Sequence, residues 1–304
     1  METPLAPTSS AAARLLLVDG HALAYRSFHA IQDLTSPAGR AVGAVYGFIR
    51  ALERMSSRLR PSHAQVVWDG GLAAERVAAL PGYKAQRPPM PPSLGEQIEE
   101  IQRYLTAAPF AWFLEAEVEA DDWIATLAER GAAGGMQVVI ASSDKDFMQL
   151  VSPRIELLNP VDKTGGLCGV AQVEAKTGVR PEQIVDWLSL IGDSVDNIGG
   201  VPGIGVKTAT DLLRQFGSVS ALYARLDEVA SERRRESLRA AAGLVRRNQD
   251  LIRLRRELPF ARAWEDLAVR APEAARLAEL YQEWGFKSLL AGVQAEAPAQ
   301  GQLF

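Results

Sequence analysis

The sequence predicts an α/β fold in which a mostly parallel sheet is flanked by helices. Short apolar runs, each the length of one buried strand, recur along the first half of the chain and each leads into an aspartate. The runs and their aspartates are Leu15–Val18 before Asp19, Gln65–Trp68 before Asp69, and Gln137–Ala141 before Asp144. Segments with helical spacing separate the runs, and this alternation is typical of parallel sheets buried on both faces. Because ligands bind outside the carboxyl ends of such strands, we expect the three aspartates to lie together.

A crossover helix is expected over Ala41–Leu59. Its apolar residues recur at helical spacing, and Gly43 and Gly47 would permit close packing against a neighbouring element. The residues expected on the buried face are Val45, Phe48, Ile49, Leu52, Met55 and Leu59.

The next segment, Arg76 to Pro92, contains PGYKAQRPPMPP. Proline removes a backbone donor and clashes with the preceding turn, so a regular helix cannot run through the centre of this stretch. We expect an extended or arched segment, with its base and flanks at about 72–105.

An acidic cluster precedes the third strand. Glu119, Asp121 and Asp122 open a helix whose apolar face holds Trp123, Ile124 and Leu127. Acidic residues in a first helical turn complement the helix dipole, so this cluster alone leaves a capping role and a metal site equally open.

After Pro181 the sequence becomes helical, with a glycine-rich turn, GVPGIG, ahead of the helix VKTATDLLRQF. Gly217 is expected to end this helix and Ser218 to cap the next. The expected inner face of the helix comprises Val206, Ala209, Leu212, Leu213 and Phe216. The chain therefore divides into a tail at 1–13, an α/β core at 14–178, a helical region at 179–293 and a tail at 294–304.

Composition limits the class of protein. The chain has 304 residues, 47% of them hydrophobic, and a net charge of −4, which argues against a simple nucleic-acid coat protein. Charge is instead segregated, because acidic clusters contrast with the arginine-rich stretch Arg225–Arg262.

Cys168 is the sole cysteine, which excludes a disulfide and a cysteine-rich zinc site, and the three histidines, His21, His29 and His63, lack zinc-site spacing. With no signal peptide or membrane-spanning run, a cytoplasmic protein is expected.

Further carboxylates in the sequence favour a metal site over a capping role for the acidic cluster at Glu119, Asp121 and Asp122. Asp144 and Asp146 flank Lys145 directly after a strand, while Asp193 and Asp196 are three apart and thus within helical reach of each other. Several carboxylates at one sheet edge repel unless cations neutralise them, and oxygen-only ligands select Mg²⁺ or Mn²⁺. Two such ions about 3.5–4 Å apart support phosphodiester hydrolysis. The glycines of GVPGIGVKTA would let amides approach a phosphate, although a tight helix–helix connection is the better explanation of a glycine-rich turn taken alone.

Six motifs, in this order, resemble the 5′-nuclease domain of bacterial DNA polymerase I and its flap-endonuclease relatives. They are LLLVDGHALAYRSFHA, VVWDG, PGYKAQR, EVEADDWIATLA, SSDKDFMQLV and GDSVDNIGGVPGIGVKTA, within a match from about Arg14 to about Leu290. The resemblance implies a PIN-like core, a helical arch and a helix-three-turn-helix at about 181–217. It also implies a metal-dependent 5′-3′ exonuclease and flap endonuclease for DNA replication and repair, here without a polymerase domain and associated with the nucleoid.

The same resemblance assigns site residues. Around a first Mg²⁺ or Mn²⁺ ion it implies Asp19, Asp69, Glu119, Asp121 and Asp122. Around a second it implies Asp144, Asp146, Asp193 and Asp196. It further implies that Arg76, Lys84 and Arg87 stand on the arch and hold the 5′ strand, with Lys84 and Arg87 exposed, and that Tyr25 stacks on the terminal base.

For the helix-three-turn-helix, the resemblance implies duplex backbone binding and a K⁺ ion at the hairpin. The residues concerned are Gly200, Gly203, Gly205, Lys207 and Thr208. The chain departs from the family pattern at Val77 and Ala78, where a polar or acidic residue is usual, and at Gly199, where proline is usual.

The last residues, from Gln300 to Phe304, resemble the QxxLF peptide that docks bacterial repair proteins on the replication sliding clamp. Leu303 and Phe304 end a tail that offers no core to bury them. A chance match of five residues is the alternative.

Two other functions are compatible with an acidic α/β fold. One is an RNA-cleaving nuclease, although small enzymes of that kind lack the long helical hairpin segment. The other is an inactive module that binds DNA junctions, against which the complete aspartate set argues. Cleavage of a 5′-flap oligonucleotide with Mg²⁺ discriminates between them.

Overall fold

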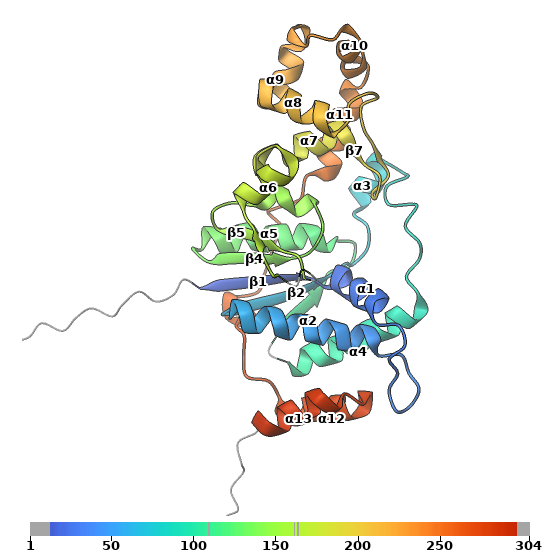
Figure 1. The fold of residues 1–304 in the computed structure, drawn as a ribbon, viewed down its shortest axis with the longest axis vertical. Helices are drawn as coiled ribbons and strands as arrows, with labels where there is room; N and C mark the ends of the chain where they lie inside the picture. The colour runs from blue at the N-terminus through green and yellow to red at the C-terminus, as the bar shows by residue number, and fades with distance from the viewer. Residues whose placement is uncertain (1–12, 109, 161, 163, 297–304) are drawn as a thin grey trace, which may run out of the picture.

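The structure is a computed structural model that describes residues 13–108, 110–160, 162 and 164–296. Its centre is a six-stranded sheet in the order β3-β2-β1-β4-β5-β6 (Figure 1). The strands are β1 (Arg14–Asp19), β2 (His63–Trp68), β3 (Ala111–Leu114), β4 (Gln137–Ala141), β5 (Ile155–Leu158) and β6 (Leu167–Cys168). Only the β5–β6 pair of this sheet is antiparallel, so the predicted mostly parallel sheet is confirmed.

The register places the three strand-end aspartates at one edge. In β1, Val18 is paired with Val66 of β2 and Ala141 of β4. Asp19 ends β1, Asp69 follows β2 directly and Asp144 lies three residues beyond β4. The aspartates therefore gather at the carboxyl edge of the central strands, as the sequence predicts.

One face of the sheet is covered by α1 (Gly20–Ala30), α2 (Gly43–Leu59) and α4 (Pro92–Ala107). The six residues expected on the inner face of α2 are all buried. A Cβ on Gly43 would lie 1.9 Å from the Ile31 carbonyl oxygen, and one on Gly47 would lie 2.8 Å from Ser27. These glycines thus permit the close packing of α1 on α2 that was expected.

The other face is covered by α5 (Ala120–Ala133), η1 (Asp146–Leu150) and α6 (Val170–Thr177), and its core continues without a break into the helical region. That region comprises η2 (Pro181–Gln183), α7 (Ile184–Ile191), α8 (Val206–Phe216), α9 (Val219–Ala224), η3 (Leu226–Glu228), α10 (Glu232–Ala240) and α11 (Ala242–Ile252). Gly217 ends α8 and the Ser218 hydroxyl caps α9, as predicted. Val206, however, is 56% exposed, and Ile204 in the preceding turn is the buried apolar residue there.

Asp193 and Asp196 lie on a hairpin and not on a helix. The strands β7 (Gly192–Asp193) and β8 (Ile198–Gly199) form a two-stranded ladder between α7 and α8. Gly192 has a φ of +79°, which ends α7, and the turn then uses Asn197 at a φ of +60°. The expected helical spacing of the two aspartates is therefore wrong, although both still face the same neighbourhood.

The proline-rich segment begins as a short helix, α3 (Ala74–Ala79), and then runs without regular structure to α4. Figure 1 shows it passing along one side of the molecule from α3 to α4. We call residues 80–91 the arch. Its turn rests on the β7–β8 loop, because the Lys84 amide donates to the Asp196 carbonyl at 3.2 Å and the Asn197 side chain donates to the Gly82 carbonyl at 2.8 Å.

The chain returns from α11 to the core by residues 253–273, of which we call Arg253–Leu258 the strap. After η4 (Trp264–Leu267), helices α12 (Ala274–Trp284) and α13 (Lys287–Glu296) pack on the α2 and α4 face, at the far end of the molecule from α9 and α10 (Figure 1). The helical region thus ends near Ile252, earlier than the expected 293. Across the described residues, no helix combines the length and apolar character that crossing a membrane requires.

Candidate metal centre

A cavity of about 340 Å³ opens at the carboxyl edge of the sheet. It collects acidic residues from β1, the β2 end, α5 and the β4 end, together with an aromatic residue of α1 and two cations of the arch. The expected site residues in its lining are Asp19, Asp69, Glu119, Asp121, Asp144, Tyr25, Lys84 and Arg87. Sequence positions more than a hundred residues apart are thereby brought to one place.

Backbone amides and short side chains hold the first carboxylates. Asp19 caps α1, accepting from the Ala22 amide at 2.9 Å, and its other oxygen accepts from the Ser142 hydroxyl at 3.0 Å. Asp69 accepts from the Ala120 amide at 2.8 Å, and its own amide donates to Nδ1 of His21. His21 therefore orients a strand end, and Ser142 contributes to the site although no sequence pattern singles it out.

A second group lies beside the cavity. Asp146, Asp193 and Asp196 each offer a carboxylate oxygen, and these oxygens lie within 4.8 Å of one another. Asp144 joins the two groups, since its carboxylate accepts from the Asp146 amide at 2.9 Å. One oxygen of Asp146 is buried without a hydrogen-bond partner among the described residues. A buried acceptor left unpaired among hard oxygen ligands fits a divalent cation such as Mg²⁺ or Mn²⁺.

Lysine and arginine side chains contact these carboxylates. The Lys84 ammonium lies 2.5 Å from Glu119 and 3.9 Å from Asp196, Arg87 lies 2.6 Å from Asp196, and Lys145 lies 2.7 Å from Asp193. The expectation that Lys84 is exposed is wrong, because the residue is 7% exposed, with its ammonium between two carboxylates and near the Tyr83 ring. The Arg87 side chain is 47% exposed, as expected for the arch.

Asp122 and Arg76 lie outside the cavity. The Arg76 guanidinium donates to one oxygen of Asp122 at 2.7 Å and lies 3.3 Å from Glu119. The amide and Nε of Arg255 donate to Asp122 at 2.9 and 2.8 Å. Consecutive helical residues point in directions about 100° apart, so Asp121 faces the cavity while Asp122 faces away from it. Arg76 is therefore a buried residue at the base of the arch, and not a free cation above the metals.

Crowding changes the acidity of the carboxylates. Burial, with Asp69 and Asp144 nearby, raises the pKa of Asp19 to about 7. Burial and neighbouring aspartates also raise the pKa values of Asp121, Asp144 and Asp146. Burial alone would raise the pKa of Glu119 as well, but Lys84 and Arg76 hold that pKa below its ordinary value. Proton binding and cation binding are thus two ways of relieving the same repulsion.

The turn before α8 is open to solvent. Gly203, Gly205 and Lys207 are exposed, Thr208 and Gly200 are half-buried, and no side chain caps the first turn of α8. A cavity of about 420 Å³ beside the turn is lined by Pro202, Gly203 and residues of α10 that include Arg233 and Arg234. The Gly199 carbonyl accepts from the Asn248 side chain at 2.8 Å, which ties this end of the hairpin to α11.

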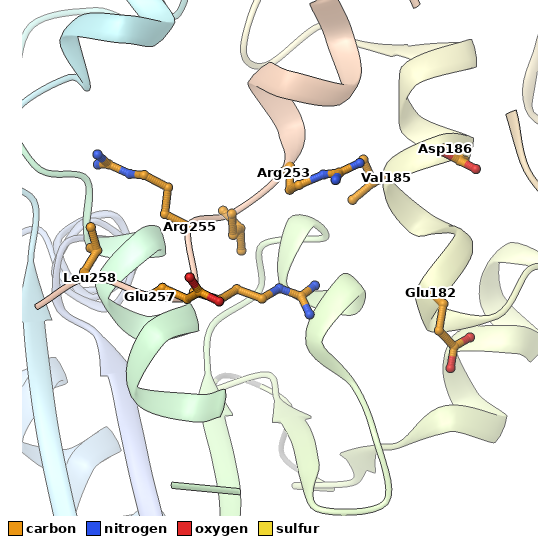
Figure 2. A pocket seen from close by; sticks show the side chains of 9 residues that line it. Glu182, Val185, Asp186, Arg253, Arg255, Glu257 and Leu258 are labelled. Carbon is orange, nitrogen blue, oxygen red and sulfur yellow. The ribbon is translucent and has the colours of Figure 1, made fainter. Parts of the chain in front are cut away.

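A larger cavity, of about 670 Å³, lies away from the carboxylates, between α7 and the strap (Figure 2). Its lining mixes Arg253, Arg255 and Arg256 with Glu182, Asp186 and Glu257. None of the expected metal ligands lines it.

Comparison with known proteins agrees with the geometry. A family model described as "5′-3′ exonuclease, N-terminal resolvase-like domain" matches residues 14–178, and one described as "5′-3′ exonuclease, C-terminal SAM fold" matches residues 179–275. The chain belongs to the 5′-3′ exonuclease family. The resemblance identified from the six motifs is confirmed.

Individual members of the 5′-3′ exonuclease family show how much is shared. The chain is 37% identical to DNA polymerase I of Bacillus caldotenax over 91% of its own length but only 32% of that protein. It is 36% identical to the 5′-3′ exonuclease of Aquifex aeolicus, covering 91% of this chain and 93% of that one. A solved complex of a bacteriophage T5 flap endonuclease with DNA and metal ions superposes with a TM-score of 0.65 and 23% identity, covering 93% of this chain and all of that one.

The raised pKa values lead to a prediction about metal-free protein. Between pH about 4 and about 7, folded protein holds protons that unfolded chains have lost, so the melting temperature in EDTA falls as pH rises through this window. Groups with lowered pKa values act oppositely: His21, whose pKa burial lowers, and, in the lower part of the window, Glu119 and Glu283, whose pKa values neighbouring cations lower. Because metal ions compete with these protons, a fixed Mg²⁺ concentration raises the melting temperature more at about pH 8 than at about pH 6. Equal shifts at both pH values, measured by calorimetry, would contradict the prediction.

Proposed function

We propose that this chain is a 5′ nuclease that uses Mg²⁺ or Mn²⁺ to hydrolyse DNA phosphodiester bonds at 5′ ends and 5′ flaps. The observation that carries the proposal is the convergence of two carboxylate groups beneath an arch that bears Lys84 and Arg87. Replication and repair of DNA in the cytoplasm, at the nucleoid, is the corresponding cellular role.

The two carboxylate groups supply the metal positions. Asp19, Asp69, Asp121 and Glu119 would hold one ion, and Asp146, Asp193 and Asp196 the other, with Asp144 between them. When bound, such ions activate water and stabilise charge on the reacting phosphate. The chain's own contribution is a set of hard oxygen ligands whose orientation is fixed by amides and by Ser142 before any ion arrives.

Residues of the arch and α1 would hold the 5′ strand. Arg87 is half-exposed at the cavity rim and Lys84 points its ammonium into the cavity between Glu119 and Asp196. Both can contact a phosphate that enters from the rim and stabilise its charge. Tyr25, in the cavity lining and beside the His29 ring at 6.4 Å between centroids, offers a face on which a terminal base can stack.

Duplex DNA would bind at the turn before α8. The exposed Gly203 and Gly205 leave backbone amides accessible, and Lys207 adds positive charge at the first turn of the helix. Gly200 and Thr208 complete the surface, and a K⁺ ion at this turn is part of the proposal. Contacts of this kind go to phosphates, so binding is sensitive to salt and insensitive to sequence.

The C-terminal residues Gln300, Leu303 and Phe304 lie outside the described residues. Their part in the proposal, docking on the bacterial sliding clamp, is supported by the sequence pattern alone. It adds a protein partner to the DNA substrate.

The first prediction concerns the metal ligands. Asp144→Ala or Asp193→Ala should abolish Mg²⁺-dependent cleavage of a 5′-flap oligonucleotide while leaving duplex affinity within about three-fold, because neither side chain lies at the turn before α8. Cleavage is followed in single-turnover assays and binding by fluorescence anisotropy. Absence of cleavage by the unaltered protein would refute the proposed function, and normal turnover by either variant would refute the ligand assignment.

The second prediction separates the two arch cations. Arg87→Ala should lower flap cleavage about ten- to a hundred-fold with little change in melting temperature, because its side chain is half-exposed. Lys84→Met should lower both cleavage and melting temperature, because it leaves the buried Glu119 with fewer compensating cations. Arg50→Ala is the matched control, since Arg50 is 55% exposed and pairs with Glu53 on α2. An Arg87→Ala variant that cleaves like Arg50→Ala would exclude a role for this arch residue.

The third prediction concerns the tail. Deleting Gln300–Phe304 should leave cleavage of free oligonucleotides unchanged, because the metal centre lies in the α/β core. The deletion should remove binding to the sliding clamp of the same organism in calorimetry. Intact protein that does not bind the clamp would show that the motif match is fortuitous.

A further inference from the structure

We propose that Asp122 is a positioning residue: with Arg76 and Arg255 it locks the base of the arch and the strap onto α5, and it holds no metal ion itself. The inference rests on the proposed function and deepens it, because it removes one carboxylate from the expected ligand set and assigns it a different task.

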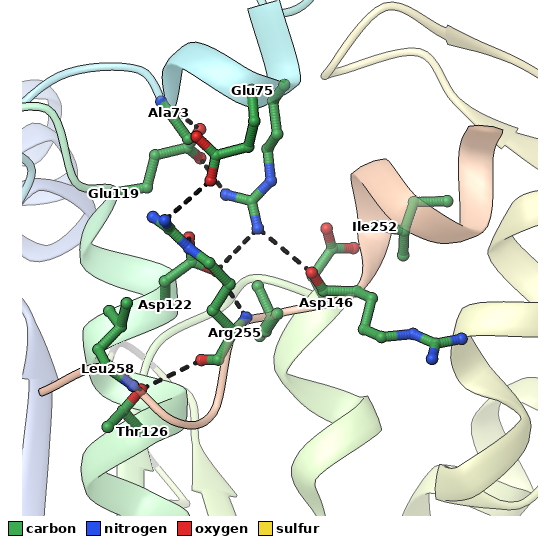
Figure 3. Close-up of polar contacts among 12 residues, drawn as sticks. Ala73, Glu75, Glu119, Asp122, Thr126, Asp146, Ile252, Arg255 and Leu258 are labelled. Carbon is green, nitrogen blue, oxygen red and sulfur yellow. Dashed lines mark hydrogen bonds and ion pairs between the residues drawn. The ribbon is translucent and has the colours of Figure 1, made fainter. Parts of the chain in front are cut away.

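The placement of Asp122 on α5 is the first step. Thr126 lies one turn further along the same face, and both residues bind the strap (Figure 3). Asp122 accepts from the amide and Nε of Arg255, while the Thr126 hydroxyl donates to the Arg255 carbonyl at 3.2 Å and accepts from the Leu258 amide at 3.3 Å. This face of α5 is therefore committed to the strap, whereas Asp121 lines the metal cavity.

The second step is the saturation of the Asp122 carboxylate. Three donors, one from Arg76 and two from Arg255, lie within 2.9 Å of its two oxygens, and its side chain has no exposed surface. A metal ion at Asp122 would have to displace these three hydrogen bonds and take from both arginines the counter-charge that they share, leaving Arg76 with Glu119 and Arg255 with Glu75.

The third step connects Asp122 to the cavity. Arg76, which also lies 3.3 Å from Glu119, donates to the Arg253 carbonyl at 3.3 Å. The Ala73 amide, at the start of the same short helix, donates to the other oxygen of Glu119 at 3.3 Å. Anything that shifts Arg76 therefore shifts Glu119, and Glu119 lines the metal cavity and pairs with Lys84.

The strap depends on these polar contacts because close packing does not hold it on both sides. The large cavity lies between the strap and α7, as Figure 2 shows. On the core side the strap is fixed by Asp122, by Thr126 and by Gln149, whose side chain accepts from the Leu254 amide at 3.1 Å. Since α11 ends at Ile252, the same contacts fix the end of the helical region relative to the metal centre.

Metal binding tests the inference without relying on activity. Calorimetric titration with Mn²⁺ should give Asp122→Asn the same number of bound ions as the unaltered protein, whereas Asp121→Asn should lose one. Loss of an ion in Asp122→Asn would overturn the proposal and restore Asp122 to the ligand set. The number of bound ions remains informative even if the protein does not cleave flaps. Absence of flap cleavage would refute the proposed function but not this inference.

Two arginines of the strap provide a matched pair. Arg255 and Arg256 are neighbours with side chains 36% and 38% exposed, but Arg256 pairs with Glu129 and does not contact Asp122. Arg255→Met should reduce single-turnover flap cleavage about ten- to a hundred-fold, as removal of a residue that orients metal ligands does, and Arg256→Met should not. Because Arg255 is part-exposed, its variant tests the idea even if Asp122→Asn fails to fold. Equal rates for the two variants would contradict the inference.

A double-mutant cycle completes the test. If Asp122 acts through Arg76, the Arg76→Met and Asp122→Asn variant cleaves no more slowly than the worse single variant, because the same contact is lost in each. Rate losses that multiply would show that the two residues act independently, and the proposal would then be wrong.

Discussion

Repulsion among carboxylates at one edge of a parallel sheet is the constraint on which the rest of this structure depends. Parallel strands end at the same edge, so Asp19, Asp69 and Asp144 cannot avoid one another once β1, β2 and β4 are paired. Water alone does not relieve the repulsion, because Asp19 is buried and Asp144 is half-buried. The raised pKa values of Asp19, Asp121 and Asp146 reflect the repulsion and burial that hydrogen bonds from amides and hydroxyls do not offset.

The groups that balance the negative charge of each carboxylate differ with the direction in which that carboxylate points. Asp19 and Asp69, which line the cavity, accept hydrogen bonds from backbone amides, and Glu119 pairs with the Lys84 ammonium. Asp122 points the other way and pairs with the buried Arg76 and the part-exposed Arg255. Arginine suits that position, because its planar fork makes several directed hydrogen bonds and stays charged when buried. Asp121 and Asp122 belong to the same sequence motif, but they face different directions on α5 and therefore have different partners.

The sequence predicts the parts of the structure whose signals are local. Continuous apolar runs give β1 and β4, helical spacing gives α2, and the positions of strand ends bring the first aspartates together. The hairpin that carries Asp193 and Asp196 was missed because strands of two residues have no periodicity. The burial of Lys84 and the role of Arg255 depend on contacts between residues more than thirty and more than a hundred positions apart, and no local pattern encodes these. For the same reason the return of α12 and α13 to the core was not foreseen.

Long-range contacts also hold the arch against the loop that carries Asp193 and Asp196 of the second carboxylate group. The arch touches the β7–β8 loop through the Lys84 amide, the Asn197 side chain and the Gln86 side chain, which donates to the Ser194 carbonyl. Its near end continues α3, which Arg76 ties to α5, and its far end is the proline-rich stretch before α4, whose φ angles are fixed. The arch is therefore held at its base by α5 and along its turn by the loop that carries Asp193 and Asp196. Because Lys84 contacts Glu119 of one group and Asp196 of the other, its buried ammonium takes its counter-charges from both carboxylate groups.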